Sequence, residues 1–295
     1  MNLEPDAAQR QLAGAVRKNE ASVESTASGW KVFDAVGITE ALAAEPGAPP
    51  VLGQVDWCLV FEELGAGCRD HQLIRSVRTF LDVYGSGPGA GPAAAAFRHW
   101  AHERRSAPGP PDAIVERTTG EGRGVWRITA GQPAPLNALP EVELNASAAR
   151  EVADRELLAV AAYAVGVGRR CLEAAQQRAD ARVIAGRRLL EYQGTSHRLA
   201  RCAVDLSIAR AGLWRAALAE DEGERAGHRA PACAAACLST ALDCAHNVVQ
   251  VFGAAGTSDP AMVRLFRTAY SLPAVTGSVS ALWRSAGARR LPSLV

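Results

Sequence analysis

Lysine is almost absent from this sequence of 295 residues. Only Lys18 and Lys31 occur, so nearly all of the 32 basic side chains are arginines. An excess of charge is missing as well, because 31 acidic residues leave a formal net charge of +1. A protein that binds nucleic acid or a membrane surface usually carries a strong basic excess. The charge balance therefore argues against both kinds of partner.

Long hydrophobic runs are also missing. No segment reaches the roughly 18 uninterrupted apolar residues of a membrane-spanning helix. The first ten residues, MNLEPDAAQR, are acidic and polar, unlike a secretory signal or a transit peptide. These features predict a cytoplasmic protein with no membrane span.

A disulfide framework is not expected, because the seven cysteines are an odd number in a long chain without a signal sequence. Cys233, Cys237 and Cys244 lie four and seven residues apart in an alanine-rich segment. That spacing places them on one face of a helix, where free cysteines pack as small hydrophobic residues. We therefore expect core packing there and no metal site.

Abundant alanine and few β-branched runs favour helices over most of the chain. Apolar residues recur at helical spacing in the first third, with breaks at PGAPP (46–50) and GSGPGAGP (85–92). The pattern predicts an N-terminal helical domain over 1–106, with helices at 5–25, 30–44, 54–65, 70–84 and 93–104.

Residues 107–146 differ in kind. The segment AIVERTTGEGRGVWRITAG reads as strand, glycine-rich turn and strand, and EVEL (141–144) suggests a third strand. The segment is too short for an independent β-barrel, so we expect a small β insert that packs on its neighbours.

From residue 147 to 295 the helical pattern returns. Long helices are predicted at 148–179, 194–220 and 232–252, with shorter ones at 260–270 and 277–287. The helix at 194–220 carries two adjoining apolar stripes, which suits packing against two partners at once. The first stripe contains Leu199, Ala203, Leu206, Arg210, Leu213 and Ala217, and the second contains Val204, Ile208, Ala211, Trp214 and Leu218. This region is predicted to form a four-helix bundle.

Four motifs, three in this region and one near the N-terminus, give the chain a specific likeness. The stretch RVIAGRRLLEYQGTSHRLA (182–200) resembles the acyl-CoA dehydrogenase pattern R-x-x-F-G-x-x-[IL]-x-x-[FY]-Q-x-x-x-H-x-L-A. QVFGAAG (250–256) resembles the family's Q-x-x-G-G-x-G, and RLFRTA with TGS (276–278) resembles its R-x-x-R-D-A…E-G-T. LVFEELGAGC (59–68) is similar to its L-x-x-E-E-L. The order and the intervals match.

The resemblance implies a mainly α fold with an N-terminal helical domain, a middle β domain and a C-terminal four-helix bundle. Family members bind FAD between the β domain and the bundle, across a subunit interface. They remove the α-proton and β-hydride of an acyl thioester, which requires a carboxylate near the α-carbon. A homodimer, a tetramer or a heteromer with a sister subunit is implied.

The sequence departs from the family pattern in three places. The middle β domain is reduced, and the flavin-contacting strings T-E-x-x-x-G-S and W-[IV]-[ST] have no clear counterpart. The usual catalytic glutamate is replaced by Thr276, whose hydroxyl cannot act as a base at neutral pH. Ala185 and Ala254 replace the aromatic residue and second glycine of two motifs.

Some relatives place the catalytic glutamate on the first bundle helix, and that position corresponds to Glu156. Glu156 precedes Leu157 at the edge of the predicted buried face. It is therefore either the replacement base or an ordinary glutamate in the first turns of a helix, where acids are favourable.

Arg182, Gln250, Gly253 and Ser278 are the cofactor-binding residues that the resemblance implies. Arg182 would contact the FAD diphosphate of a neighbouring subunit, or cap helix carbonyls. Gln250 and Gly253 would lie near the adenosine half, unless Gly253 simply ends a helix. Ser278 would face an anion, or serve only as an N-cap.

Three functions remain open at this level. The first is an FAD-dependent dehydrogenase acting on an acyl thioester of CoA or a carrier protein. The second is a degenerate, non-catalytic subunit of a heteromeric acyl-CoA dehydrogenase. The third is a flavin-independent enzyme that reuses the fold in acyl or polyketide metabolism.

Overall fold

The structure is a computed structural model of the chain. It describes residues 4–22, 32, 36, 52–68, 113–118, 124–129, 142–144 and 146–291. The helices expected at 70–84 and 93–104 lie outside the described residues. Of the helix expected at 30–44, only Val32 and Val36 are described.

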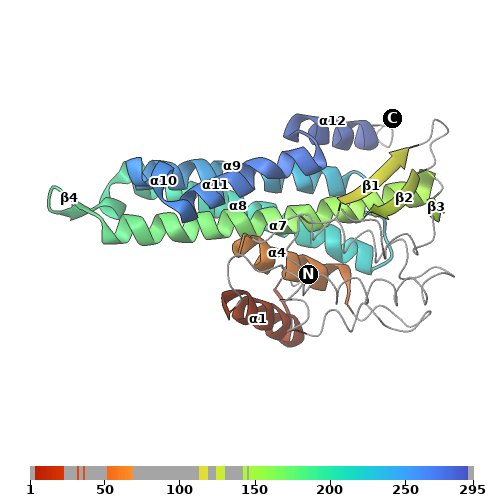
Figure 1. Cartoon of the computed structure of the whole chain (residues 1–295), viewed down its shortest axis with the longest axis horizontal. Helices are drawn as coiled ribbons and strands as arrows, with labels where there is room; N and C mark the ends of the chain where they lie inside the picture. The colour runs from red at the N-terminus through yellow and green to blue at the C-terminus, as the bar shows by residue number, and fades with distance from the viewer. Residues whose placement is uncertain are drawn as a thin grey trace.

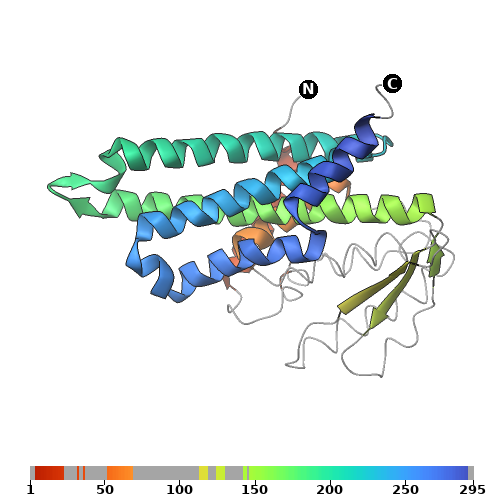
Figure 2. The ribbon, with the colours of Figure 1, turned by 90° about the horizontal axis from the view of Figure 1, so that it is seen from above.

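Four long helices form the C-terminal bundle: α7 (Ala146–Ala181), α8 (Gln193–Asp221), α9 (Arg229–Phe252) and α11 (Pro260–Thr276). They run side by side along the long axis of the molecule in Figures 1 and 2. The short α10 (Ala254–Ser258) joins α9 to α11, and α12 (Val279–Arg290) packs against α9. The predicted bundle is confirmed, and α11 extends beyond the expected 260–270.

The central helix is α9, which packs against α7, α8, α11 and α12. Cys237 and Cys244 are buried in these contacts, and Cys233 is half-buried. Among the described residues, α9 alone has the length and mean hydropathy of a membrane-crossing helix. Its position among four other helices explains the apolar composition, because a core helix is covered on most sides.

A short β-hairpin and a 3₁₀ turn separate α7 from α8. Strands β4 (Val183–Ile184) and β5 (Arg187–Arg188) pair as an antiparallel hairpin, followed by the 3₁₀ turn η2 (Leu189–Glu191). Ala185 and Gly186 connect the strands with φ of +47° and +76°. Both residues of this hairpin turn therefore adopt left-handed backbone.

Two described helices precede the bundle: α1 (Ala7–Ser22) and α4 (Gln54–Ala66). α4 packs against α1, α7 and α8, and eleven of its thirteen residues are buried. Its contact with α7 is unusually close, because a Cβ on Gly65 would overlap the backbone of Tyr163. A Cβ on Gly166 would likewise overlap the carbonyl of Glu62. Glycine thus allows two backbones to touch.

The β segment forms one antiparallel sheet in the order β1-β2-β3, with β1 (Ala113–Thr118), β2 (Gly124–Thr129) and β3 (Val142–Leu144). Ile114 pairs with Ile128, and Trp126 pairs with Val142. The two paired strands and the third strand that the sequence predicts are confirmed, and the turn expected between the first two lies outside the described residues. β3 leads directly to α7, against which it packs. The division into domains at 1–106, 107–146 and 147–295 stays a prediction.

Candidate functional site

Arg182 and Gly253 meet at the end of the bundle beside the β4–β5 hairpin. A Cβ added to Gly253 would lie 3.8 Å from Nη1 of Arg182. Gly253 ends α9 with φ of +64°, and Gln250 is exposed one turn earlier. Three of the six residues that the sequence singled out therefore share one corner, which carries a guanidinium and exposed helix-end backbone.

The adjoining turn of α7 completes this corner. Arg178 lies over the ring of Phe252, with its Cζ 5.5 Å from the ring centroid. The backbone N–H of Leu189 donates to the carbonyl of Arg182 at 2.7 Å, which fixes the chain where it leaves α7. The corner is thus held by α7, α9 and the hairpin together.

Thr276 and Ser278 lie elsewhere, at the junction of α11 and α12. The Thr276 hydroxyl donates to the carbonyl of Leu272 at 3.4 Å, as an ordinary helix-end threonine does. Oγ of Ser278 accepts from the backbone N–H of Ala281 at 3.2 Å, so Ser278 is the N-cap of α12. Within the chain, Ser278 therefore acts as an N-cap, which is one of the two roles expected for it.

Glu156 lies in the N-terminal half of α7. Its side chain is buried, with 7% of the residue exposed. Both views of the bundle place the α11–α12 junction alongside this half of α7, and α11 packs against α7 (Figures 1 and 2). Glu156 is therefore covered by protein, rather than displayed to solvent like an ordinary surface glutamate in a helix.

A second buried acid lies two residues before Glu156. Oδ1 of Asp154 accepts from Nη1 of Arg289 on α12 at 2.6 Å, and the same Nη1 donates to the carbonyl of Gly227 at 2.9 Å. Burial raises the pKa of Asp154 above its ordinary value, although the bond from Arg289 opposes this effect. The pair ties the end of α12 to the start of α7.

Sequence reasoning missed a cluster of charges between α4, α7 and α8. Glu62 and Glu63 are 2% and 4% exposed on α4. Glu63 accepts two bonds from Arg17, at 3.0 and 2.7 Å, and two from Arg169, at 3.0 and 2.7 Å. Glu62 accepts from Arg169 at 3.4 Å and from Arg210 at 2.8 Å. The only sequence signal was the E-E pair itself, because its partners come from distant segments.

The electrostatics of the cluster favour the ionised form of Glu63. Burial raises the pKa of Glu63, but the hydrogen bonds and charges of Arg17 and Arg169 outweigh it and leave that pKa below the ordinary value. The same carboxylate raises the pKa of Arg169 despite the cost of burying the guanidinium. The cluster is thus a set of charges that ties four helices together, with Arg17 on α1, two glutamates on α4, Arg169 on α7 and Arg210 on α8.

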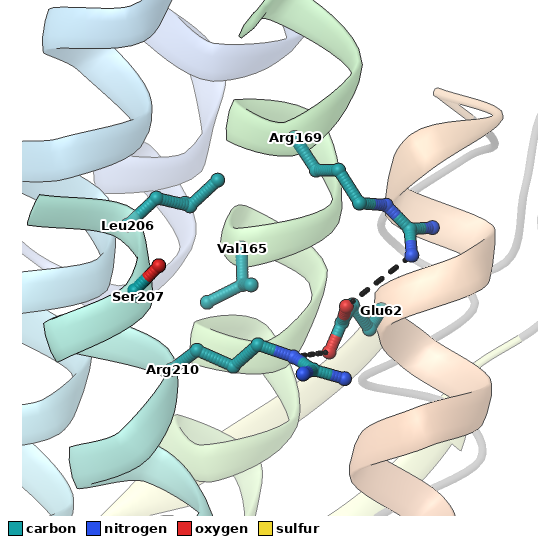
Figure 3. Close-up of a pocket in the computed structure, with 6 residues that line it drawn as sticks. All are labelled: Glu62, Val165, Arg169, Leu206, Ser207 and Arg210. Carbon is teal, nitrogen blue, oxygen red and sulfur yellow. Dashed lines mark hydrogen bonds and ion pairs between the residues drawn. The ribbon is translucent and has the colours of Figure 1, made fainter. Parts of the chain in front are cut away.

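A cavity of about 170 Å³ adjoins this cluster, and Figure 3 shows it opening between α4, α7 and α8. It is lined by Glu62, Val165, Arg169, Leu206, Ser207 and Arg210. None of these six residues is among those that the sequence singled out as a candidate site. No group of three or more potential metal ligands occurs in the described part of the chain.

The comparison with protein families gives one match in the bundle. Residues 146–291 match the sequence profile described as acyl-CoA dehydrogenase, C-terminal domain. The matched segment begins with α7 and ends just beyond α12. It therefore contains the corner at Arg182 and Gly253 as well as Glu156, Thr276 and Ser278.

Solved structures of similar fold cover nearly the whole chain. One is the Tcur3481-Tcur3483 steroid ACAD G363A variant, with 18% identity, a TM-score of 0.76, and coverage of 97% of this chain and 98% of that one. The ChsE4-ChsE5 complex from Mycobacterium tuberculosis matches with 17% identity, a TM-score of 0.75 and the same coverage. The FAD complex of PigA matches at 16% identity and a TM-score of 0.76, covering 99% of each chain.

Proposed function

Because the chain belongs to the acyl-CoA dehydrogenase family, we propose that it is a flavoprotein that oxidises an acyl thioester to the α,β-unsaturated product. The acyl group would be carried on CoA or on a carrier protein. The assembly would be a homodimer, a tetramer or a heteromer, in line with the complexes that similar chains form.

The burial of Glu156 is the observation that carries this proposal. The reaction needs a base at the α-carbon, and Thr276 supplies none. Glu156 offers a carboxylate in the N-terminal half of α7 that is buried and so shielded from bulk water. A shielded carboxylate can take the α-proton without competition from solvent, which is what the chemical step requires. We assign it the role of base.

The corner at Arg182 and Gly253 fits the diphosphate and adenosine part of FAD. Arg182 presents a permanent positive charge there, and the positive φ of Gly253 leaves the backbone open to close approach. The exposed Gln250 amide can donate to an adenosine group. In this role Arg182, Gln250 and Gly253 would bind the diphosphate and adenosine of FAD bound to a neighbouring subunit. Bound flavin would supply the acceptor for the β-hydride.

The test begins with the absorbance spectrum of the purified protein, before and after addition of FAD. We expect flavin bands that bleach when an acyl thioester is added. In Glu156→Gln, exchange of the α-proton with deuterium should fall by about 100-fold or more at unchanged flavin content, as expected on loss of a general base. Glu151→Gln, on the same helix but paired with Arg225, is the matched control. Unchanged exchange in Glu156→Gln would remove Glu156 from the mechanism.

A second candidate is a non-catalytic subunit of a heteromeric dehydrogenase. Thr276 at the usual base position favours it, and ChsE4-ChsE5 is a complex of two named chains with this fold. In that case the isolated chain would be colourless with FAD and would form a stable complex with a flavin-bearing sister chain. Flavin bands in the isolated protein would contradict this candidate.

A further inference from the structure

The cavity between α4, α7 and α8 contains the guanidinium of Arg210, which is held in place but donates only some of its hydrogen bonds. Nε of Arg210 donates to Glu62 at 2.8 Å, and its Cζ lies 4.5 Å from the ring centroid of Trp214. Together these two contacts fix the plane of the guanidinium, and Figure 3 shows the bond to Glu62. Neither Nη atom of Arg210 has an acceptor among the described residues, so four N–H groups remain available.

The second arginine of the cavity also has a spare donor. The Nη atoms of Arg169 are taken by Glu62 and Glu63, but its Nε is buried without a hydrogen-bond partner. The nearest carboxylate, on Glu173, lies 4.0 Å away, which is beyond hydrogen-bond distance. A buried donor without a partner is costly, and a bound acceptor would remove that cost.

The fixed charges around the cavity leave one positive charge over. Three guanidiniums, on Arg17, Arg169 and Arg210, face the two carboxylates of Glu62 and Glu63. Glu173 is half-exposed and is shared between Arg169 and Arg170. An excess of one charge matches a monovalent anion better than a dianion, which the carboxylate of Glu62 would repel.

The walls of the cavity add an apolar part. Val165 and Leu206 line it, and both point into the space between α7 and α8 in Figure 3. Ser207, at the rim, is exposed, and its hydroxyl oxygen can still accept a bond while it donates to the carbonyl of Ala203. The space of about 170 Å³ suits a molecule of a few heavy atoms.

We propose that this cavity binds a small monocarboxylate. The two carboxylate oxygens would accept from Nη1 and Nη2 of Arg210, the end-on form of a bidentate pair. The short hydrocarbon tail would contact Val165 and Leu206. The site is separate from the Arg182 corner and from Glu156, and it does not depend on the dehydrogenase function.

Isothermal titration of the full-length protein, in a buffer free of carboxylate and phosphate, tests the proposal. Acetate, butyrate and inorganic phosphate are the probes. We expect saturable one-to-one binding of butyrate, weaker binding of acetate because its tail is shorter, and binding of phosphate at least tenfold weaker than butyrate. No saturable binding, or a preference for phosphate, would overturn the proposal, because ordered water or a different anion would then fill the cavity.

Variants locate the site. Arg210→Gln should weaken butyrate binding at least tenfold, whereas Arg201→Gln, an exposed arginine on the same helix, should not change it. Since Arg210→Gln also removes a partner of Glu62, Val165→Phe provides a second variant that keeps every charge. It fills the apolar part and should lower butyrate affinity more than acetate affinity. Equal affinities in the protein and both cavity variants would contradict the assignment.

Discussion

At the residue scale, the most consequential feature is the carboxylate of Glu63, which accepts hydrogen bonds from two arginines. Glu63 is almost fully buried, and its two oxygens accept four bonds from Arg17 and Arg169. Taking such a charge out of water is costly, and only complete pairing makes the arrangement stable. The cluster therefore tolerates the loss of a partner poorly.

Glu63→Gln should lower the free energy of unfolding by about 3 kcal/mol at pH 7, because it leaves the mostly buried Arg169 without its main counter-charge. Chemical denaturation measures this difference. Glu173→Gln, which removes only a half-exposed partner of Arg169, should change it by less than about 0.5 kcal/mol. Similar losses in the two variants would contradict the role of burial.

The stability of the unmodified protein and that of Glu63→Gln should also depend differently on pH. The pKa of Glu63 is lowered in the folded protein, so its contribution is complete above the ordinary glutamate pKa of about 4.3. It is lost as the pH falls through the lower, folded-state pKa. The stability gap between the unmodified protein and Glu63→Gln should therefore be constant from pH 6 to 7 and shrink below about pH 4.

At the scale of elements, periodicity predicted helices well and their contacts poorly. The limits expected for the three long bundle helices differ from those observed by no more than three residues, because alanine-rich apolar stripes and the glycines at 186 and 253 are local signals. Arg210 was placed within an apolar stripe, yet it turns to Glu62, 148 residues away in the sequence. A long-range pair of charges leaves no periodic trace, so the charge cluster could not be predicted.

The candidate corner was partly predictable for the same reason. Arg182 and Gly253 stand at the ends of strongly periodic helices, and a bundle with short connections brings such ends together. The position of Glu156 was predicted only as the edge of a buried face, whereas α7 is covered there too. What covers a helix depends on packing between elements, which spacing along one helix cannot show.

The close contact between α4 and α7 leads to a prediction about stability. Gly166→Ala should destabilise the protein by at least about 3 kcal/mol, because the new methyl group overlaps the backbone of Glu62 and the helices must separate. Gly212→Ala, in an exposed part of α8 whose nearest neighbour atom is 4.0 Å away, should stabilise it by about 0.5–1 kcal/mol. Thermal unfolding of both variants measures the contrast; equal effects would show that helix propensity alone is at work.

At the scale of the whole molecule, two large apolar side chains on α8 remain exposed. Val204 and Ile208 on α8 are 57% and 66% exposed, and they lie one turn apart. They belong to the second of the two stripes that the sequence predicted for contact with a partner. Exposed apolar patches of this kind mark surfaces for association, and similar chains form complexes.

Ile208→Glu should therefore shift the protein toward lower mass in light scattering, since a carboxylate buried in such a contact would lack a partner. Gln177→Glu, an exposed change on α7, serves as the control and should leave the mass unchanged. If both variants keep the mass of the unmodified protein, α8 does not contribute to association.

The unbroken length of α7 has a consequence for how activity is distributed between copies. Glu156 and Arg182 stand 26 positions apart near opposite ends of this helix, about 39 Å at 1.5 Å per residue. A dinucleotide is shorter than that gap, so in the proposed roles, with Glu156 as the base and Arg182 as a ligand of FAD, the two residues of one chain would serve different pockets. Glu156→Gln and Arg182→Gln chains, each inactive as a pure sample, should regain activity when refolded together. Half of the pockets in every hybrid dimer would then combine an intact base with an intact arginine, and failure of such complementation would mean that each polypeptide works alone.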